Sequence, residues 1–146
     1  MFIFTLGLTE SWVHRDSGTV FPLAPGALVG HYDACCYGFY NASFTEFLDD
    51  FLEFESIVKS LRNSTPYRII LTVSPVPLTA TASGKHVLVS NTYFKSVLRA
   101  VAGYLSERYS HIDYFPSYEI VTNPRLLQAR IVTISARYEK NWLILS

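Results

Sequence analysis

Hydroxyl, phenol and carboxyl side chains that could act as a nucleophile, an acid or a base follow three short apolar runs of the chain. Glu10 follows the first run, Ser74 the second, and Ser117-Tyr118-Glu119 the third. If the runs are parallel strands, these side chains meet at the carboxyl edge of one sheet, where open α/β sheets place their ligands. Gly7 ends the first run, and main-chain N–H groups in the turn after it could bind an oxyanion. The sequence therefore predicts a pocket with these residues on its rim.

Ser74 is the candidate nucleophile of this edge, and His86 lies on the loop that follows it. No Gly-x-Ser-x-Gly motif surrounds Ser74, so a hydroxyl that caps its own loop is an alternative. His86 is also compatible with an exposed loop histidine, and Gly7 with a plain strand-ending glycine. No Asp follows Asp113 and no His follows His111. A triad whose acid and base come late in the chain therefore has no candidates here.

The other histidines and the cysteines do not form a metal-ligand pattern. The histidines outside the predicted rim show no paired spacing (His14, His31 and His111). Cys35 and Cys36 cannot complete a four-ligand site without help. Neighbouring cysteines rarely form a disulfide, because the ring would strain the peptide between them. We therefore expect two reduced thiols, no metal and no cofactor.

The composition favours one globular domain and excludes several classes of partner. The chain has 146 residues, of which 49% are hydrophobic and 16% charged, and its formal net charge is zero. So few charges exclude intrinsic disorder, and zero net charge provides no broad field for nucleic acid or anionic lipid.

No apolar run is long enough to span a membrane. Residues 1–8 make a poor signal peptide, since no basic residue precedes them and no cleavage site follows. The expected compartment is the cytoplasm.

Hydrophobic periodicity predicts alternating strands and helices. Apolar runs predict buried strands at residues 2–6, 68–73 and 112–115. Apolar residues at steps of three and four predict amphipathic helices at residues 43–61 and 93–109. Ser43 and Glu46 match a capping box for the first helix, and Asn91 is the candidate N-cap of the second. Gly- and Pro-rich residues 8–42 predict a long loop that could hold short strands, and residues 78–90 predict a second loop.

This order of elements is typical of a parallel α/β sheet with helical crossovers. Three strands make a thin sheet, and residues 122–146 show no third helix with a clean apolar stripe. We therefore expect an incomplete domain over residues 1–121 and a divergent tail over residues 122–146. An incomplete sheet leaves an edge uncovered, through which the chain could self-associate.

Four segments resemble GSCFA-domain proteins, in the order in which that family has them. They are residues 4–12 (FTLGLTESW), 71–81 (LTVSPVPLTAT), 95–101 (KSVLRAV) and 113–120 (DYFPSYEI). The resemblance covers roughly residues 2–121. It departs from the family at Phe94, where similar sequences have Ser, and after about Asn123.

The family resembles SGNH-type serine ester hydrolases, which implies a three-layer, flavodoxin-like parallel sheet. The resemblance places the nucleophile in an N-terminal Gly-Ser-Cys-Phe-Ala motif and the acid and base in a late Asp-x-x-His-like segment, and this chain has neither. It also makes Gly7 and Thr9 the oxyanion-hole candidates, although the family-like block has Asn near Thr9. The complete family member is expected to act on an acyl or O-acetyl ester, a carbohydrate ester among them. For this chain we expect no useful turnover; the alternatives are a non-catalytic ligand-binding module and a protein-interaction module.

Overall fold

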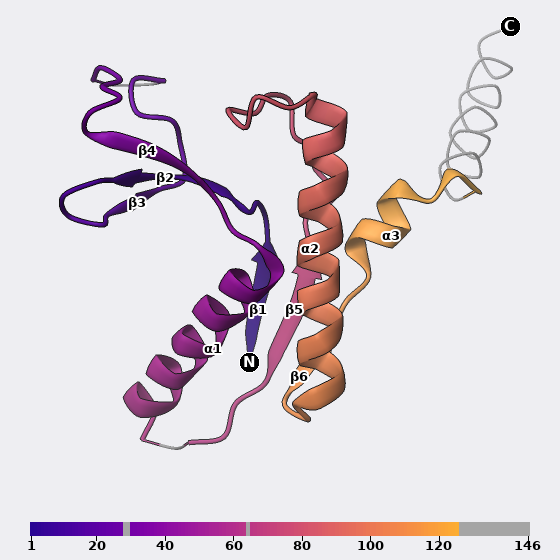
Figure 1. Cartoon of the computed structure of the whole chain (residues 1–146). Helices are drawn as coiled ribbons and strands as arrows, with labels where there is room; N and C mark the ends of the chain where they lie inside the picture. Colours follow the sequence, from indigo (N-terminus) through magenta and orange to yellow (C-terminus); the bar gives the residue numbers. More distant parts are fainter. Residues whose placement is uncertain (28–29, 64, 126–146) are drawn as a thin grey trace, which may run out of the picture.

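A parallel three-stranded sheet forms the centre of the molecule, for which a computed structural model describes residues 1–27, 30–63 and 65–125. Its strands lie in the order β1 (Phe2–Leu6), β5 (Ile69–Val73) and β6 (Ile112–Tyr114) (Figure 1). Both strand pairs are parallel, with Phe4 opposite Leu71 and Leu71 opposite Tyr114. The three predicted strands and their parallel pairing are therefore confirmed. The expectation that residues 2–6 form a buried strand is wrong, because β1 is an edge strand of this sheet and only its Leu6 is buried.

Two long helices connect these strands. The helix α1 (Phe44–Leu61) leads from β4 to β5, and α2 (Val87–Arg108) leads from β5 to β6. The predicted capping box of α1 is confirmed, because Ser43 N donates to Glu46 Oε2 over 2.8 Å and Glu46 N donates to Ser43 Oγ over 3.4 Å. These bonds satisfy main-chain N–H groups of the first turn, which have no partner within the helix.

The helix α2 begins earlier than its apolar pattern predicts, at Val87. Its N-cap is His86, whose Nδ1 accepts a hydrogen bond from Leu88 N over 3.2 Å. The prediction that Asn91 is the cap is wrong. Asn91 lies inside the helix, and its Oδ1 accepts a hydrogen bond from Leu78 N over 2.8 Å. Its polar side chain therefore holds the preceding loop against the helix.

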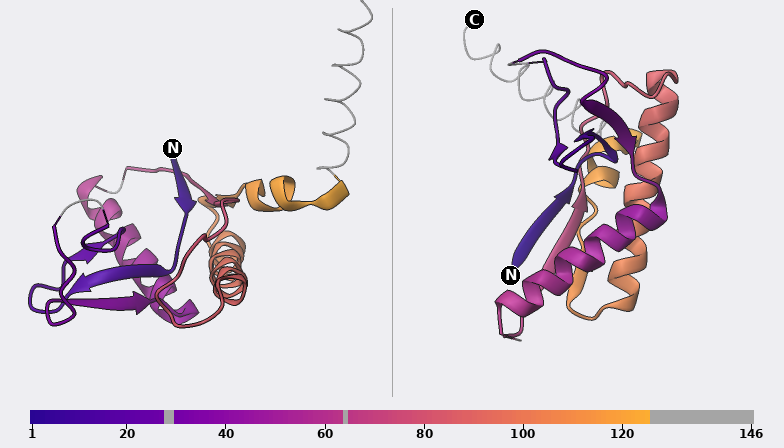
Figure 2. Two further views of the ribbon diagram at one scale, coloured as in Figure 1. Left: turned by 90° about the horizontal axis from the view of Figure 1, so that it is seen from above. Right: turned by 60° about the vertical axis from the view of Figure 1, so that its left-hand side comes forward.

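Both long helices cover the same face of the sheet. They pack against each other, and Figure 2 shows them on one side of β1 and β5. Two crossovers of the same hand that step across a sheet in one direction place their helices on one face. The described residues thus form two layers, and the opposite face leaves Ile3 69% exposed. The three-layer, flavodoxin-like arrangement stays a prediction.

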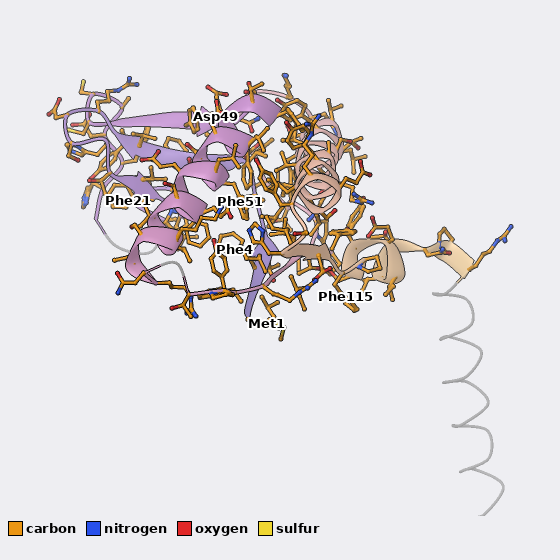
Figure 3. All side chains as sticks on the ribbon, turned by 90° about the horizontal axis from the view of Figure 1, so that it is seen from below. Met1, Phe4, Phe21, Asp49, Phe51 and Phe115 are labelled. Carbon is orange, nitrogen blue, oxygen red and sulfur yellow. The ribbon has the colours of Figure 1, made fainter. Side chains whose placement is uncertain are left out.

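The core lies between this sheet and the two helices. Phe4 of β1 and Phe51 of α1 point toward each other in Figure 3, with ring centroids 5.8 Å apart in an edge-to-face arrangement. The largest fully buried side chains come from β1, β5, β6 and α2 (Leu6, Ile69, Leu71, Val73, Phe94, Leu98, Val101, Leu105 and Ile112). Burial of these apolar groups is the main source of the fold's stability.

The long segment predicted as a loop contains a second, antiparallel sheet. Its strands lie in the order β3 (Val20–Phe21), β2 (Glu10–His14) and β4 (Tyr37–Asn41). Trp12 of β2 lies opposite Phe39 of β4. This sheet stands beyond the carboxyl end of β1, so it forms a wall next to the edge of the parallel sheet (Figure 1).

A short helix, α3 (Ser117–Thr122), follows β6. It precedes the residues for which the sequence predicts no clean third helix (122–146), and none of its residues is buried. Most of the predicted divergent tail lies outside the described residues. No helix in the described parts of the chain has the length and apolar character needed to cross a membrane.

Candidate functional site

The segments that follow the three parallel strands meet at one edge, which we term the carboxyl edge (residues 7–10, 74–77 and 115–119). Ser74 N donates to Leu6 O over 2.9 Å, joining the ends of β5 and β1. Phe115 N donates to Leu71 O over 2.8 Å, and Ser117 Oγ donates to Val73 O over 2.9 Å. The structure therefore brings the predicted segments together, and each side chain can be judged by its partners.

Neither oxyanion-hole candidate presents a side-chain donor to the edge. Thr9 is 3% exposed, and its Oγ1 donates to Asn41 Oδ1 over 2.6 Å. A hydroxyl has a single proton, so this bond leaves none for an oxyanion. Gly7 is exposed, and a Cβ on it would have open space around it. The backbone at Gly7 is thus accessible, while packing does not require a glycine there.

Glu10 begins a chain of polar contacts that ties β2 to α2. Thr81 Oγ1 lies 2.7 Å from Glu10 Oε1 and 2.9 Å from Ser83 Oγ. Ser83 Oγ in turn lies 2.9 Å from Ser90 Oγ, a buried group on the first turn of α2. This chain fixes the Glu10 carboxylate beside the loop that follows β5.

A groove of about 350 Å³ lies beside Glu10, between the antiparallel sheet and the loop after β5. We term it the carboxyl-edge groove. Its walls are mainly apolar and include aromatic rings (Leu8, Glu10, Trp12, Pro22, Leu23, Ala24, Phe39, Leu78, Ala80, Thr81 and Ala82). The Trp12 and Phe39 rings pack edge to face with centroids 5.7 Å apart. An apolar groove with few polar groups is typical of small-molecule sites.

Ser74 and His86 do not interact. The Ser74 hydroxyl accepts a hydrogen bond from Val76 N over 3.3 Å, which is the loop-capping alternative. The imidazole of His86 is exposed and caps α2 through Leu88 N. The carbonyl of Ser74 accepts a hydrogen bond from the ammonium of Lys95, a buried side chain of α2. A serine without a neighbouring base is a weak nucleophile.

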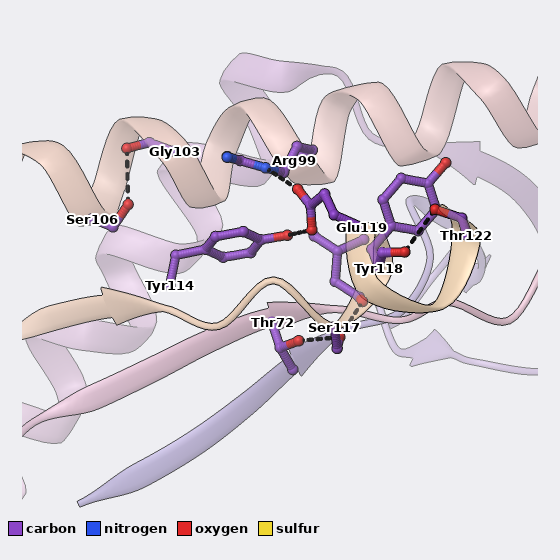
Figure 4. A network of polar contacts seen from close by, with 10 residues as sticks. Thr72, Arg99, Gly103, Ser106, Tyr114, Ser117, Tyr118, Glu119 and Thr122 are labelled. Atoms are coloured by element: carbon purple, nitrogen blue, oxygen red, sulfur yellow. Dashed lines mark hydrogen bonds and ion pairs between the residues drawn. The ribbon is translucent and has the colours of Figure 1, made fainter. Parts of the chain in front are cut away.

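The residues after β6 form a structural network, shown in Figure 4. Ser117 Oγ contacts Thr72 Oγ1 and donates to Val73 O, so it anchors α3 to β5. Glu119 accepts hydrogen bonds from Arg99 Nε over 2.6 Å and from Tyr114 OH over 2.7 Å.

Charge and burial shift the pKa values of Glu119 and Tyr114, two members of this network that can lose a proton. Burial alone would raise the pKa of Glu119, but the hydrogen bonds from Tyr114 and Arg99 and the guanidinium charge hold it below its usual value. Burial raises the pKa of Tyr114, and the hydrogen bond to Glu119 adds to the rise. Glu119 is therefore a paired carboxylate, and Tyr114 is a neutral phenol.

A second polar cluster lies at the opposite, amino edge of the sheet. The carboxylate of Glu55 is buried, and its Oε1 lies 2.6 Å from His111 Nε2, 2.7 Å from Lys59 Nζ and 3.2 Å from Tyr67 OH. Sequence reasoning missed this cluster. Its only signal was an acidic residue one helical turn after Phe51, on the apolar face of α1.

The amino-edge cluster joins an imidazole, a carboxylate and a hydroxyl, but not in the order of a triad. Tyr67 donates to Glu55, which is also the partner of His111, so the imidazole is not placed to take the phenol proton. Burial raises the pKa of Tyr67, and the charge of Glu55 adds to the rise. The hydroxyl is therefore a poor nucleophile. The described residues also contain no group of three or more side chains suited to a metal ion.

The GSCFA family model matches residues 1–131 of the chain. The chain belongs to the GSCFA family. The match continues past residue 121, at which the resemblance of the four sequence segments to the family was expected to end. No curated protein and no solved structure matches this GSCFA chain.

Proposed function

We propose that this GSCFA chain binds an acyl or O-acetyl ester, such as an acetylated carbohydrate, in the carboxyl-edge groove and does not hydrolyse it alone. The observation that carries the proposal is the groove beside Glu10, next to the carboxyl ends of β1 and β5. The family's resemblance to SGNH-type ester hydrolases supports the ester as ligand, since such sheets bind their ligands at this edge.

The groove has side chains that suit an acetylated sugar. Trp12 and Phe39 offer ring faces and edges to apolar C–H groups, and Leu23 offers an apolar wall for a methyl group. Glu10 is the acceptor that would orient a sugar hydroxyl. The few polar groups of such a site determine orientation, while the apolar walls supply most of the contact area.

The partners of the hydroxyl groups are the reason why we expect no turnover. Among the described residues, Thr9 donates to Asn41, Ser117 donates to Val73 O, and Ser74 contacts only Val76 N through its hydroxyl. No described imidazole lies within hydrogen-bond distance of these hydroxyls. Nucleophilic catalysis needs such a base.

Tryptophan fluorescence tests the binding. The sequence has two tryptophans, so Trp142→Phe leaves Trp12 in the groove as the sole reporter. The probe is a methyl hexopyranoside with one O-acetyl group, and the unacetylated glycoside is its control. We expect the emission to change in a saturable way as the acetylated glycoside is added. Leu23→Ala should weaken the affinity for this glycoside about tenfold. Leu61→Ala, at an exposed leucine of α1, is the matched control. Equal affinity for both glycosides, or no saturation, would refute the proposal.

A second candidate function is self-association through β1, favoured by exposed apolar side chains on an edge strand. In the described residues β1 pairs with β5 alone, while Ile3 of β1 is 69% exposed and Met1, which precedes the strand, is 79% exposed. Such an edge is a template for pairing with another strand. Sedimentation should show a concentration-dependent dimer that Ile3→Lys abolishes and Leu61→Lys leaves intact. A monomer at all concentrations would eliminate this candidate.

A further inference from the structure

Lys95 is a buried cation for which the described residues supply no carboxylate. Lys95 is part of α2, and the residue is only 3% exposed. The ammonium donates to Ser74 O and lies 4.6 Å from the ring centroid of Phe94 and 5.7 Å from that of Tyr118. The ion pairs among the described residues do not include it. A buried charge is costly unless it is paired, and one carbonyl uses only one of its three protons.

A pocket of about 200 Å³ lies beside this lysine, between α2 and α3. Its walls carry no acidic side chain (Asn91, Thr92, Lys95, Ser96, Arg99 and Tyr118). The hydroxyls of Thr92 and Ser96 donate to main-chain carbonyls of α2, so they do not offer protons to the pocket. The remaining polar groups are donors: an amide, an ammonium, a guanidinium and a phenol.

Two of these donors are already held in place. Arg99 uses Nε to bind Glu119 over 2.6 Å, and its guanidinium carbon lies 4.2 Å from the ring centroid of Tyr114 (Figure 4). Its terminal nitrogens remain as donors. Asn91 uses Oδ1 to accept from Leu78 N, so the Nδ2 protons are the part of its amide left to donate. Donors fixed in advance lose less freedom when a ligand binds.

We propose that this pocket binds a small oxyanion, a carboxylate or phosphate group, between Lys95 and Arg99. The two cations with Glu119 leave a net positive charge at the site, and the amide and phenol complete its donors. Carboxylate and phosphate oxygens accept several charge-assisted hydrogen bonds, which Arg and Lys provide. The Lys95 ammonium also donates to Ser74 O. Lys95 would therefore connect the bound anion to the residue that follows β5. The site lies on different residues from the carboxyl-edge groove, so it does not depend on the ester proposal.

Titration of the ¹⁵N-labelled chain with inorganic phosphate, and separately with sodium acetate, tests the proposal at constant ionic strength set by chloride. We expect saturable shifts of amide signals at Asn91 and Lys95 with at least one of the two anions. Arg99→Gln should weaken binding by about tenfold or more. Arg108→Gln, at an exposed arginine of the same helix, is the matched control and should leave the affinity unchanged.

Lys95→Met is the more direct variant, and its spectrum first establishes that it folds. A folded Lys95→Met that loses saturable binding supports the proposal. If this variant does not fold, Arg99→Gln decides, because its side chain is 43% exposed and its loss leaves the core intact. Shifts that grow in proportion to the anion concentration without saturation would overturn the proposal. Affinity that is unchanged in Arg99→Gln would overturn it as well.

Discussion

The imidazole Nε2 of His111 lies 2.6 Å from Oε1 of Glu55, a carboxylate in a residue that is only 3% exposed. Glu55 is part of α1, and His111 immediately precedes β6, so the contact joins a helix to the amino edge of the sheet. Lys59 and Tyr67 contact the same oxygen. A buried carboxylate with three partners contributes to stability chiefly because its removal would leave these three polar groups without their partner.

Glu55→Gln should destabilise the fold by about 1–3 kcal/mol, because the neutral amide cannot satisfy three donors as a carboxylate does. Urea unfolding at pH 7 measures this. Glu53→Gln, at an exposed position of the same helix, should change the free energy of unfolding by less than about 0.5 kcal/mol. Equal losses in both variants would contradict a role for the buried contacts.

The contribution of Glu55 should depend on pH. Burial alone would raise the pKa of Glu55, but the contacts with Lys59 and His111 hold it below its usual value of 4.5. A carboxyl with a depressed folded pKa stabilises the fold above its unfolded pKa, and this stabilisation disappears as the pH falls through the folded value. The difference in unfolding free energy between wild type and Glu55→Gln should therefore shrink below about pH 4.5. A difference that stays constant down to pH 3 would be inconsistent with this linkage.

Ser117→Ala should cost about 1–2 kcal/mol, since it removes the bond to Val73 O and leaves the nearly buried Thr72 hydroxyl without its partner. The comparison variant is Ser106→Ala, whose hydroxyl donates to Gly103 O within α2. Thermal unfolding should show a clearly larger loss for Ser117→Ala. Identical melting temperatures would mean that α3 is not anchored through this serine.

His86 and Asn91 should have separable effects on hydrogen exchange. His86→Ala removes the cap of α2, at a cost of about 1 kcal/mol, and should speed exchange at the Leu88 amide. Asn91→Ala should speed exchange at the Leu78 amide instead. Native-state exchange followed by NMR distinguishes the two sites. Faster exchange at Tyr93 or Phe94 after Asn91→Ala, with no change at Leu78, would restore Asn91 as the cap.

The elements with a strong apolar pattern were predictable from the sequence. β1 and β5 are continuous apolar runs, and α1 combines an apolar stripe with the Ser43–Glu46 capping box. The antiparallel sheet was not predictable in the same way. Every residue of β2 is half-buried, so the strand lacks the alternation of buried and exposed positions that indicates a strand.

The candidate site was predictable in its location but not in its contacts. Parallel strands placed Ser74 and Ser117 at one edge, whereas the partners of their hydroxyls depend on rotamers and loop paths that periodicity does not describe. Lys95 and Glu55 were missed because a charged residue on a helix is normally solvated. Each lies at a core-facing position of its helix, where the helical pattern calls for an apolar residue. Such departures are expected where polar groups have a structural or functional role.

Hydrolysis of 4-nitrophenyl acetate by the purified chain tests most directly whether the carboxyl edge lacks an activated nucleophile. We predict that the wild-type chain and the Ser74→Ala variant at the same concentration hydrolyse the ester equally slowly, even while the acetylated glycoside still binds at Trp12. Turnover well above that of Ser74→Ala would show that Ser74 is an activated nucleophile at the carboxyl edge, which contradicts the proposed binding without hydrolysis.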